Sequence, residues 1–228
     1  MPNYESPIIA PSLLSADFSC LSKSARQVGD AGAKWLHFDV MDGHFVPNLT
    51  FGPLAVEALR KHTSLFFDVH LMVSRPESLI EAFAGAGADL ITVHVEACPH
   101  LHKVIHQIKA CGVKAGAALN PGSPLVLVEE VLEDLDLLLI MTVNPGFPAQ
   151  EFILSAEEKI RRARDRLSRH PEILLEVDGG IHTDTAARVV CAGANVLVAG
   201  SAVFGARDPG RAYVELGQIT SAAFDKIR

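Results

Sequence analysis

Short runs of apolar and β-branched residues recur along the chain, and segments with helical spacing separate them. The apolar runs predict strands at residues 7–13, 35–40, 66–72, 90–95, 114–119, 136–143, 174–179 and 196–200. Helical spacing predicts helices at 19–32, 53–61, 76–86, 99–110, 124–133, 155–168, 183–192 and 209–227, with 53–61 and 124–133 shorter than the rest. Strict alternation of strand and helix predicts parallel strands joined by right-handed crossovers.

Eight strand–helix units in 228 residues favour a closed (β/α)₈ TIM barrel, in the α/β class, over an open doubly wound sheet. No linker, charge block or low-complexity segment interrupts the series, so we expect one domain over residues 1–228. Hydrophobic residues make up 49% of the chain, which is enough for a sizeable core.

The strand at 35–40 and the residue after it combine an apolar face with a polar one. Side chains alternate along a strand, so His37, Asp39 and Met41 share one face while the apolar residues between them share the other. Residues two apart on one face lie roughly 7 Å apart, close enough to bind one small ion together. A half-exposed strand with a polar outer face would show the same pattern.

Polar side chains alternate with apolar ones in three further strands. The polar residues are Asp68 and His70 in the strand at 66–72, Thr92, His94 and Glu96 in and just after the strand at 90–95, and Glu176 and Asp178 in the strand at 174–179. In a (β/α)₈ barrel the chemistry lies at the carboxyl ends of the strands, so we expect these side chains to gather at one mouth. Inward polar groups that pair only with one another are the alternative interpretation.

The expected neighbouring strands would bring His37, Asp39 and His70 together. Two imidazoles and a carboxylate suit Zn²⁺, Fe²⁺, Mn²⁺ or Co²⁺. Asp178, three strands away around the ring, can reach the same ion from across the mouth. The sequence therefore predicts one divalent metal ion per subunit, bound by these four side chains.

Asp39 and Asp178 would then lie on opposite sides of one pocket. One carboxylate could take a proton from one face of a bound carbon, and the other could return a proton to the opposite face. The metal would hold the enediolate oxygens formed in between. Met41, Met72 and Met141 are expected at the same mouth as an apolar cover, although methionine is also a common gap filler.

Glycine-bearing turns follow three consecutive strands, at Gly146-Phe147, Gly179-Gly180 and Gly200-Ser201. Glycines let backbone N–H groups approach an anion, and phosphate binding after strands 7 and 8 is frequent in this fold. These turns contain no Arg or Lys, so a phosphate there would be bound through backbone dipoles.

Net charge and cysteine spacing bear on nucleic-acid binding and on the compartment in which the protein works. The net charge of −7 argues against nucleic-acid binding, and the four cysteines have no C-x-x-C spacing, which favours a reducing compartment. Residues 1–5 carry no basic leader pattern, and the longest apolar run, 135–143, is too short to cross a membrane. We therefore expect a cytoplasmic protein without membrane contact.

The remaining polar residues have simpler interpretations. Asp42 could bond loop backbone, Asp68 could orient a metal-binding imidazole, and His94 with Glu96 could form an ordinary hydrogen-bonded pair. We expect the loop and helix histidines to be solvated: His44, His62, His100, His102, His106, His170 and His182.

Six segments together resemble the ribulose-phosphate 3-epimerase family. They are APSLLSADF at 10–18, HFDVMDG at 37–43, DVHLM at 68–72, MTVNPGF at 141–147, EVDGGI at 176–181 and AGSAVF at 199–204. The similarity runs from about residue 9 to residue 204.

The resemblance implies a metal-dependent epimerase that interconverts D-ribulose 5-phosphate and D-xylulose 5-phosphate at C3, a step of the pentose phosphate pathway. It implies that His37, Asp39, His70 and Asp178 bind the metal, and that Asp39 and Asp178 are the proton acceptor and donor. Substrate contacts would come from Ser12, His70, Gly146, Phe147, Pro148, Ala149, Gly179, Gly180, Gly200 and Ser201. Members of the family are usually homo-oligomers.

This chain departs from the family at Pro148 and Ala149, where the family usually has two glycines. Proline has no N–H and fixes its own φ, so a loop that approached phosphate through this backbone would lose a donor. We therefore expect weaker or re-routed phosphate binding, or a slightly different sugar phosphate.

Three alternatives use the same barrel. A ketohexose 6-phosphate 3-epimerase, acting for example on allulose 6-phosphate, would share the reacting residues. A Schiff-base aldolase would need a lysine at the carboxyl end of a strand, but Lys114 lies at the start of its strand. A non-catalytic phosphate-binding barrel would not require two opposed carboxylates.

Overall fold

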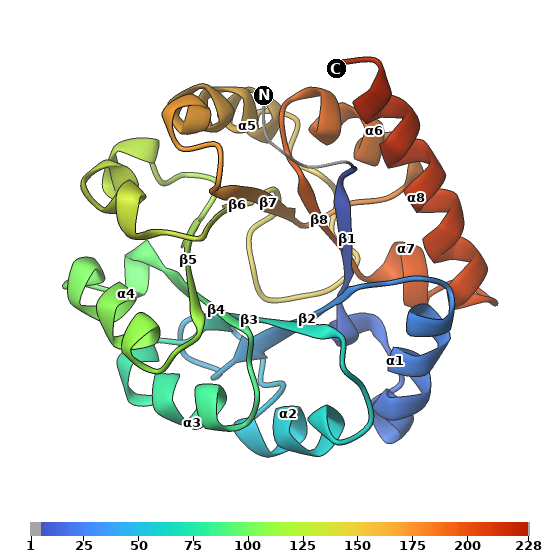
Figure 1. The fold of residues 1–228 in the computed structure, drawn as a ribbon, viewed down its shortest axis with the longest axis horizontal. Coiled ribbons are helices and arrows are strands. Elements are labelled where there is room, and N and C mark those ends of the chain that lie inside the picture. Colours follow the sequence, from blue (N-terminus) through green and yellow to red (C-terminus); the bar gives the residue numbers. More distant parts are fainter. Residues whose placement is uncertain (1–5, 228) are drawn as a thin grey trace.

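The computed structural model describes residues 6–227, so residues 1–5, where no leader pattern was expected, lie outside the described part. Eight parallel strands form one sheet that curls into a barrel, and helices cover its outside (Figure 1). The predicted (β/α)₈ TIM barrel is confirmed.

The strands follow the predicted runs closely. They are β1 (Ile8–Pro11), β2 (Trp35–Met41), β3 (Phe66–Met72), β4 (Leu90–His94), β5 (Lys114–Leu119), β6 (Leu137–Met141), β7 (Leu174–Asp178) and β8 (Val196–Ala199). Hydrogen bonding runs in the order β1-β8-β7-β6-β5-β4-β3-β2. A parallel bridge between Ser12 and His37 joins β1 to β2, so the ring closes at the residues predicted to carry the chemistry.

The outer layer contains α1 (Leu21–Asp30), α2 (Pro53–Arg60), α3 (Ile80–Gly85), α4 (Leu101–Ala110), α5 (Ala156–Arg166), α6 (Thr183–Cys191), α7 (Ser201–Phe204) and α8 (Pro209–Asp225). Shorter 3₁₀ turns are η1 (Leu13–Ser15), η2 (Phe18–Cys20), η3 (Pro76–Ser78), η4 (Val95–Ala97) and η6 (Leu167–Arg169).

The segment expected to be a helix at 124–133 is a 3₁₀ helix, η5 (Leu125–Asp134). Its buried residues Leu125, Val128 and Val131 recur every three positions, which matches the three residues per turn of a 3₁₀ helix. The short helix α7 was not predicted, because its four residues leave too little periodicity to detect.

Two apolar layers hold the barrel. The strand residues whose side chains point outward, such as Phe38 and Phe67, are completely buried under the helices. A smaller cluster that includes Trp35, Leu137 and Leu174 fills the interior. The polar inward residues therefore stand on a packed apolar base.

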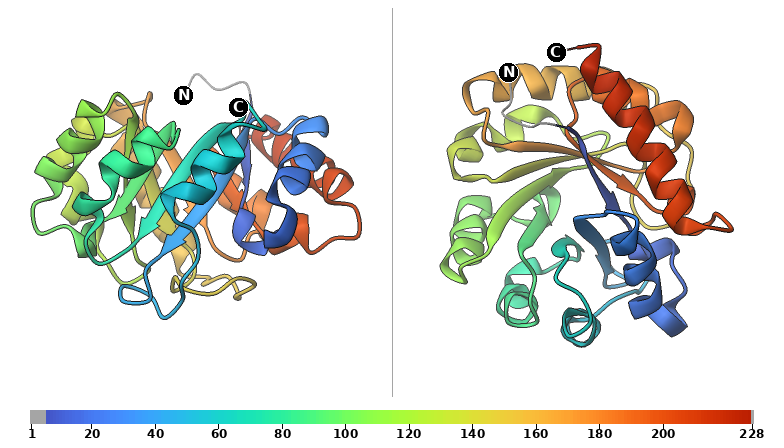
Figure 2. Two further views of the ribbon diagram at one scale, coloured as in Figure 1. Left: turned by 90° about the horizontal axis from the view of Figure 1, so that it is seen from below. Right: turned by 45° about the vertical axis from the view of Figure 1, so that its right-hand side comes forward.

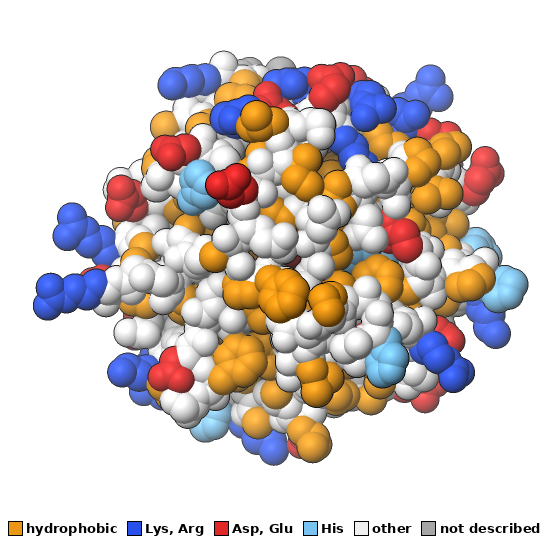
Figure 3. Space-filling model, turned by 180° about the vertical axis from the view of Figure 1, so that it is seen from behind, with side chains coloured by type: hydrophobic (Ala, Val, Ile, Leu, Met, Phe, Trp, Pro, Cys, Tyr) orange, Lys and Arg blue, Asp and Glu red, His pale blue; other side chains and the backbone are white. Residues whose placement is uncertain are grey.

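The two ends of the barrel differ. The termini of the described chain and the loop after β6 lie at opposite ends (Figure 2). The end opposite the termini carries hydrophobic side chains near its centre and charged side chains mainly around its edge (Figure 3). Among residues 6–227, none of the helices is both long and apolar enough to cross a bilayer.

Candidate active site

Strands β2 and β3 place the predicted polar residues side by side. Their register pairs His37 with Asp68 and Asp39 with His70. All four residues are buried, at 0–3% exposure. The pattern that suggested a half-exposed strand is therefore an inward, enclosed polar layer.

Asp178 reaches this layer from β7. His70 Nδ1 lies 3.6 Å from Asp178 Oδ2 and 3.8 Å from Asp39 Oδ1. His37 Nε2 lies 3.5 Å from Asp39 Oδ1. One donor atom from each of these four residues falls within 4.8 Å of the others, so the structure brings the predicted metal-binding set together.

The donor atoms fit a divalent cation. His37 Nε2 and His70 Nδ1 are buried and have no hydrogen-bond partner among residues 6–227. Buried polar atoms are nearly always bonded, so two orphaned imidazole nitrogens facing two carboxylates fit the ligand set of a cation. Two nitrogen and two oxygen donors suit Zn²⁺, Fe²⁺, Mn²⁺ or Co²⁺.

His37 is oriented by Asp68, and Glu176 lies nearby. His37 Nδ1 lies 2.6 Å from Asp68 Oδ2 and 3.8 Å from Glu176 Oε1, and all three side chains are fully buried. Burial, and then the charge of Asp68, raise the pKa of Glu176 well above its ordinary value. Asp68 therefore orients a metal-facing imidazole, as the sequence had indicated.

His70 is oriented by a different pair. Its Nε2 lies 2.8 Å from His94 Nε2, and His94 Nδ1 lies 3.1 Å from Glu96 Oε2. Glu96 belongs to η4 rather than to the strand face where it was expected, yet it contacts His94 as predicted.

Glu96, His94 and His70 form a hydrogen-bonded series, and the pKa values of Glu96 and His94 determine which atoms donate. Burial raises the pKa of Glu96, but hydrogen bonds from His94, Ser123 and the Asn120 backbone outweigh it and bring that pKa to about 2. An ionised carboxylate only accepts, so His94 donates from Nδ1. Burial lowers the pKa of His94 to about 4, so the ring is neutral and its Nε2 accepts from His70. Burial lowers the pKa of His70, but its contacts with Asp178 and Asp39 outweigh burial and raise that pKa, and its Nδ1 faces the four-donor cluster.

Asp39 is held from several sides. Ser12 Oγ donates to its Oδ2 at 2.5 Å, and Thr50 Oγ1 donates to its backbone carbonyl at 2.5 Å. Burial raises the pKa of Asp39, but the charges and hydrogen bonds of His37 and His70 prevail, and the pKa falls far below its ordinary value.

The pKa of Asp178 is shifted in the opposite direction. Burial, and then the negative charge of Asp39, raise its pKa above the ordinary value, although His70 and His37 act against them. Two carboxyl groups whose environments push their pKa values apart are suited to the roles of base and acid.

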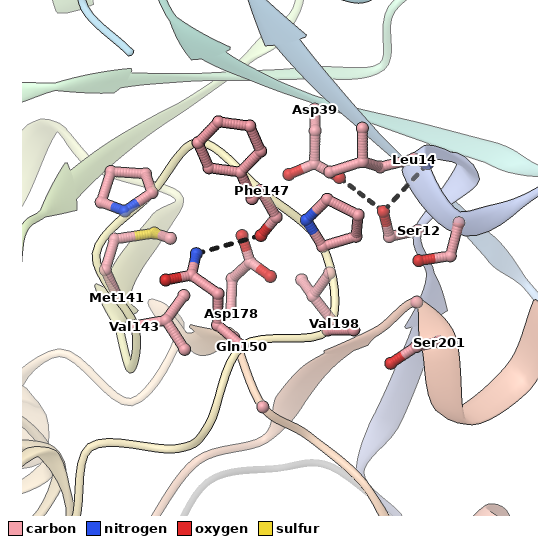
Figure 4. Close-up of a pocket in the computed structure, with 18 of the residues that line it drawn as sticks. Ser12, Leu14, Asp39, Met141, Val143, Phe147, Gln150, Asp178, Val198 and Ser201 are labelled. Carbon is pink, nitrogen blue, oxygen red and sulfur yellow. Dashed lines mark hydrogen bonds between the residues drawn. The ribbon is translucent and has the colours of Figure 1, made fainter. Parts of the chain in front are cut away.

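Both carboxylates open onto one cavity at the mouth of the barrel. The space between the lining residues, open solvent at the mouth included, is about 510 Å³. Asp39 and Asp178 enter it from separate strands, with Phe147 close by (Figure 4). The three methionines expected at this mouth, Met41, Met72 and Met141, line the cavity.

The predicted substrate contacts nearly all line this cavity. The lining includes Ser12, Gly146, Phe147, Pro148, Ala149, Gly179, Gly180, Gly200 and Ser201. His70 is not among the lining side chains, so its substrate contact stays a prediction. The lining also includes residues that the sequence did not single out: Leu14, Ser15, Val143, Pro145, Gln150, Ile181 and Val198. Val198 precedes Gly200 by two positions, and this alternation could have identified it.

Positions 179 and 180 require glycine, both for their positive φ angles and because a Cβ would clash with neighbouring atoms. Their φ angles are +116° and +64°, and a Cβ on Gly179 would overlap Val143. A Cβ on Gly180 would lie 2.7 Å from the backbone nitrogen of Phe152. These positions therefore expose bare backbone beside Asp178.

The loop after β6 has an unusual backbone at Ala149. Its φ of 57° makes it the one non-glycine residue with positive φ in the described chain. Gln150 Nε2 donates to the carbonyls of Asn144 at 2.7 Å and Phe147 at 3.0 Å, which closes the loop on itself. The position where the resemblance expects glycine thus keeps a conformation that favours glycine.

Two further predictions concern Asp42 and Lys114. Asp42 accepts from the backbone N–H groups of His44, Phe45 and Ser74, as expected of a loop residue. Lys114 is the first residue of β5 and pairs with Asp136 at 3.2 Å, away from the mouth.

A family model decides the assignment. The model of the ribulose-phosphate 3 epimerase family matches residues 8–204. The chain belongs to the ribulose-phosphate 3-epimerase family. The resemblance seen in the sequence is thereby confirmed.

Relatives in this family cover nearly the whole chain. The ribulose-phosphate 3-epimerase of Bacillus subtilis is 53% identical over 210 residues, which are 91% of this chain and 97% of the relative. The chloroplastic ribulose-5-phosphate-3-epimerase of Arabidopsis thaliana is 52% identical over 204 residues, 88% of this chain and 73% of the relative.

Solved structures share the fold at low identity. KGPDC from Streptococcus mutans has a TM-score of 0.70 and 15% identity, covering 96% of this chain and 100% of its own. The 3-hexulose-6-phosphate synthase from Salmonella typhimurium has a TM-score of 0.71 and 17% identity, with coverage of 95% and 99%. At these identities the likeness concerns the fold alone.

Proposed function

We propose that this chain is a metal-dependent epimerase that interconverts D-ribulose 5-phosphate and D-xylulose 5-phosphate. The observation that carries the proposal is the placement of Asp39 and Asp178. They come from separate strands, line one cavity, and share a four-donor cluster with two orphaned imidazole nitrogens. The names of the relatives support the substrate.

Asp39 and Asp178 would carry the proton transfers. Asp39, whose pKa is held low, would accept the C3 proton from one face of the sugar. Asp178, whose pKa is raised, would hold a proton and deliver it to the opposite face. In the reverse direction the two roles exchange.

His37, Asp39, His70 and Asp178 would bind one divalent ion per subunit, which would stabilise negative charge developing on the substrate oxygens. The two imidazoles would supply their orphaned nitrogens. The contacts of His37 with Asp68 and of His70 with His94 would keep His37 Nε2 and His70 Nδ1 turned toward the metal, which would displace any proton held there.

The remaining lining would bind and enclose the sugar phosphate. Ser12 would contact the sugar, and the backbone of Gly179, Gly180, Gly200 and Ser201 would face the phosphate. His70 lies outside the lining, and its sugar contact rests on the family resemblance alone. Pro148 has no N–H to offer, so phosphate binding by the loop after β6 would rely on its neighbours. The three methionines would form an apolar cover over the planar intermediate.

Metal analysis joined to an epimerase assay tests this proposal. The purified protein should contain about one divalent ion per subunit, lose epimerisation of ribulose 5-phosphate after chelation, and regain it when Zn²⁺, Fe²⁺, Mn²⁺ or Co²⁺ is added back. Full activity in the metal-free protein would contradict the proposal, and activity in neither form would favour a non-catalytic phosphate-binding barrel.

A ketohexose 6-phosphate would use the same reacting residues. The ratio of kcat/KM for ribulose 5-phosphate and allulose 6-phosphate separates the two substrates. We expect the pentose phosphate to be preferred, since the relatives carry that name. A preference for the hexose phosphate would move the assignment to the alternative.

We further propose that residues 1–228 form one domain that assembles into a homo-oligomer in the cytoplasm. The family resemblance supports assembly, and the free state of Cys20, Cys98, Cys111 and Cys191 fits a reducing compartment. Light scattering on the purified chain would report the oligomer, and a monomer at micromolar concentration would contradict this part.

A further inference from the structure

Two histidines on the outer wall of the barrel lie against one carboxylate. His102 and His106 are four residues apart on α4, so they share one face of that helix. Their ring centroids are 4.3 Å apart. Asp134 ends the neighbouring η5, which packs beside α4 (Figure 1).

The donor atoms of the three side chains lie close together. His102 Nε2 lies 3.9 Å from Asp134 Oδ2, and His106 Nε2 lies 3.5 Å from Asp134 Oδ1. Donors bound tetrahedrally at about 2.0 Å lie about 3.3 Å apart, so small side-chain rotations would seat a cation here. One donor atom from each residue already falls within 4.8 Å of the others.

The backbone under these side chains is well anchored. Val104, Ile105 and Ile108 bury the other face of α4, and Leu132 and Leu135 are buried on either side of Asp134. The imidazoles are exposed, at 69% and 50% of their side-chain area, so water could complete the coordination. Ligands on rigid elements lose little freedom when they bind a metal.

We propose that His102, His106 and Asp134 form a second, surface metal site for a borderline divalent cation such as Zn²⁺, separate from the four-donor cluster at the mouth. Two imidazoles and a carboxylate suit such ions. A bound ion would link α4 to η5 and stabilise this side of the barrel without touching the cavity. His102 and His106 are exposed to solvent, as the sequence predicted, and the proposal adds a ligand role for them.

Zn²⁺ titration of the holoenzyme by calorimetry tests the site. The comparison variants are His102→Ala/His106→Ala and Asp134→Asn, with the exposed His62→Ala as the matched control. We expect wild type and His62→Ala to bind one more Zn²⁺ than the double variant, and Asp134→Asn to bind it at least tenfold more weakly. Binding at the mouth is common to all variants and cancels.

Thermal unfolding gives an independent measurement. Zn²⁺ should raise the Tm of wild type more than that of the double variant, because a ligand that binds only the folded state stabilises it. Epimerase activity should be equal in all four proteins. Equal Zn²⁺ stoichiometry in wild type and the double variant would overturn the proposal, as would an unchanged affinity in Asp134→Asn.

Discussion

Asp68 accepts a hydrogen bond from His37 at paired inward positions of the neighbouring strands β3 and β2, with 2.6 Å between Oδ2 and Nδ1. This contact directs the other ring nitrogen, Nε2, to the four-donor cluster, where no residue in the described part of the chain hydrogen-bonds to it. The register of β2 and β3 fixes the contact, because His37 and Asp68 are paired residues. The pairing of β2 with β3 therefore fixes the orientation of the His37 ring in the cluster.

Replacing Asp68 with asparagine should weaken metal binding. The amide can present its NH₂ to His37 Nδ1 and favour the wrong tautomer, so we expect a loss of about 10–100-fold in metal affinity. Competition with a chelator of known affinity would measure it. The buried Thr92, which is inward but outside the cluster, offers Thr92→Ser as a control that should keep the affinity. Wild-type affinity in Asp68→Asn would contradict the positioning role.

Glu96→Gln should lose stability in a pH-dependent way. The pKa of Glu96 is about 2 in the fold against an ordinary 4.5, so its carboxylate stabilises the fold above pH 4.5. That contribution is lost as the pH falls from about 4.5 towards 2. We expect the variant to be about 1–3 kcal/mol less stable at pH 7, with the difference shrinking below pH 4.5.

Urea unfolding at several pH values between 7 and 3 would measure this difference. The exposed Glu130→Gln serves as the control and should stay within about 0.5 kcal/mol of wild type throughout. A gap between Glu96→Gln and wild type that stays constant down to pH 3 would show that the charge of Glu96 is not what stabilises the fold.

Ala149→Gly should relieve a strained backbone. A φ of 57° costs a non-glycine residue about 1–2 kcal/mol, while glycine adds unfolded-state entropy worth up to about 1 kcal/mol. We therefore expect a gain of up to about 1 kcal/mol in the free energy of unfolding. Ala82→Gly, at an exposed position of α3, should instead cost about 1 kcal/mol.

The same loop bears on phosphate binding. If Pro148 and Ala149 restrict the approach of backbone to phosphate, the variant with glycine at both positions should lower the KM for ribulose 5-phosphate. An unchanged KM would show that the two replacements leave phosphate binding intact.

Much of this molecule follows from alternation in the sequence. Asp39 and Asp178 could be placed at one mouth because inward residues of parallel strands end at the same edge of a barrel. The sequence also indicated that Asp68 could orient a metal-binding imidazole, but the strand register was needed to identify His37 as its partner.

Local conformation was harder to predict. The 3₁₀ geometry of η5 and the short α7 depend on packing that periodicity alone does not express. The chain from Glu96 through His94 to His70 depends on a turn after β4 that moves Glu96 off the strand. The cluster of His102, His106 and Asp134 joins two outer elements whose contact the sequence leaves open.

The most direct measurement follows the C3 proton in D₂O with wild type, Asp39→Asn and Asp178→Asn, after confirming equal metal content. We expect kcat for epimerisation to fall by about 10²–10⁴ in each variant. One variant should still exchange the C3 proton of ribulose 5-phosphate, and the other that of xylulose 5-phosphate, because each keeps the carboxyl on one face. Near-wild-type epimerisation in either variant would contradict proton transfer by two opposed carboxyl groups.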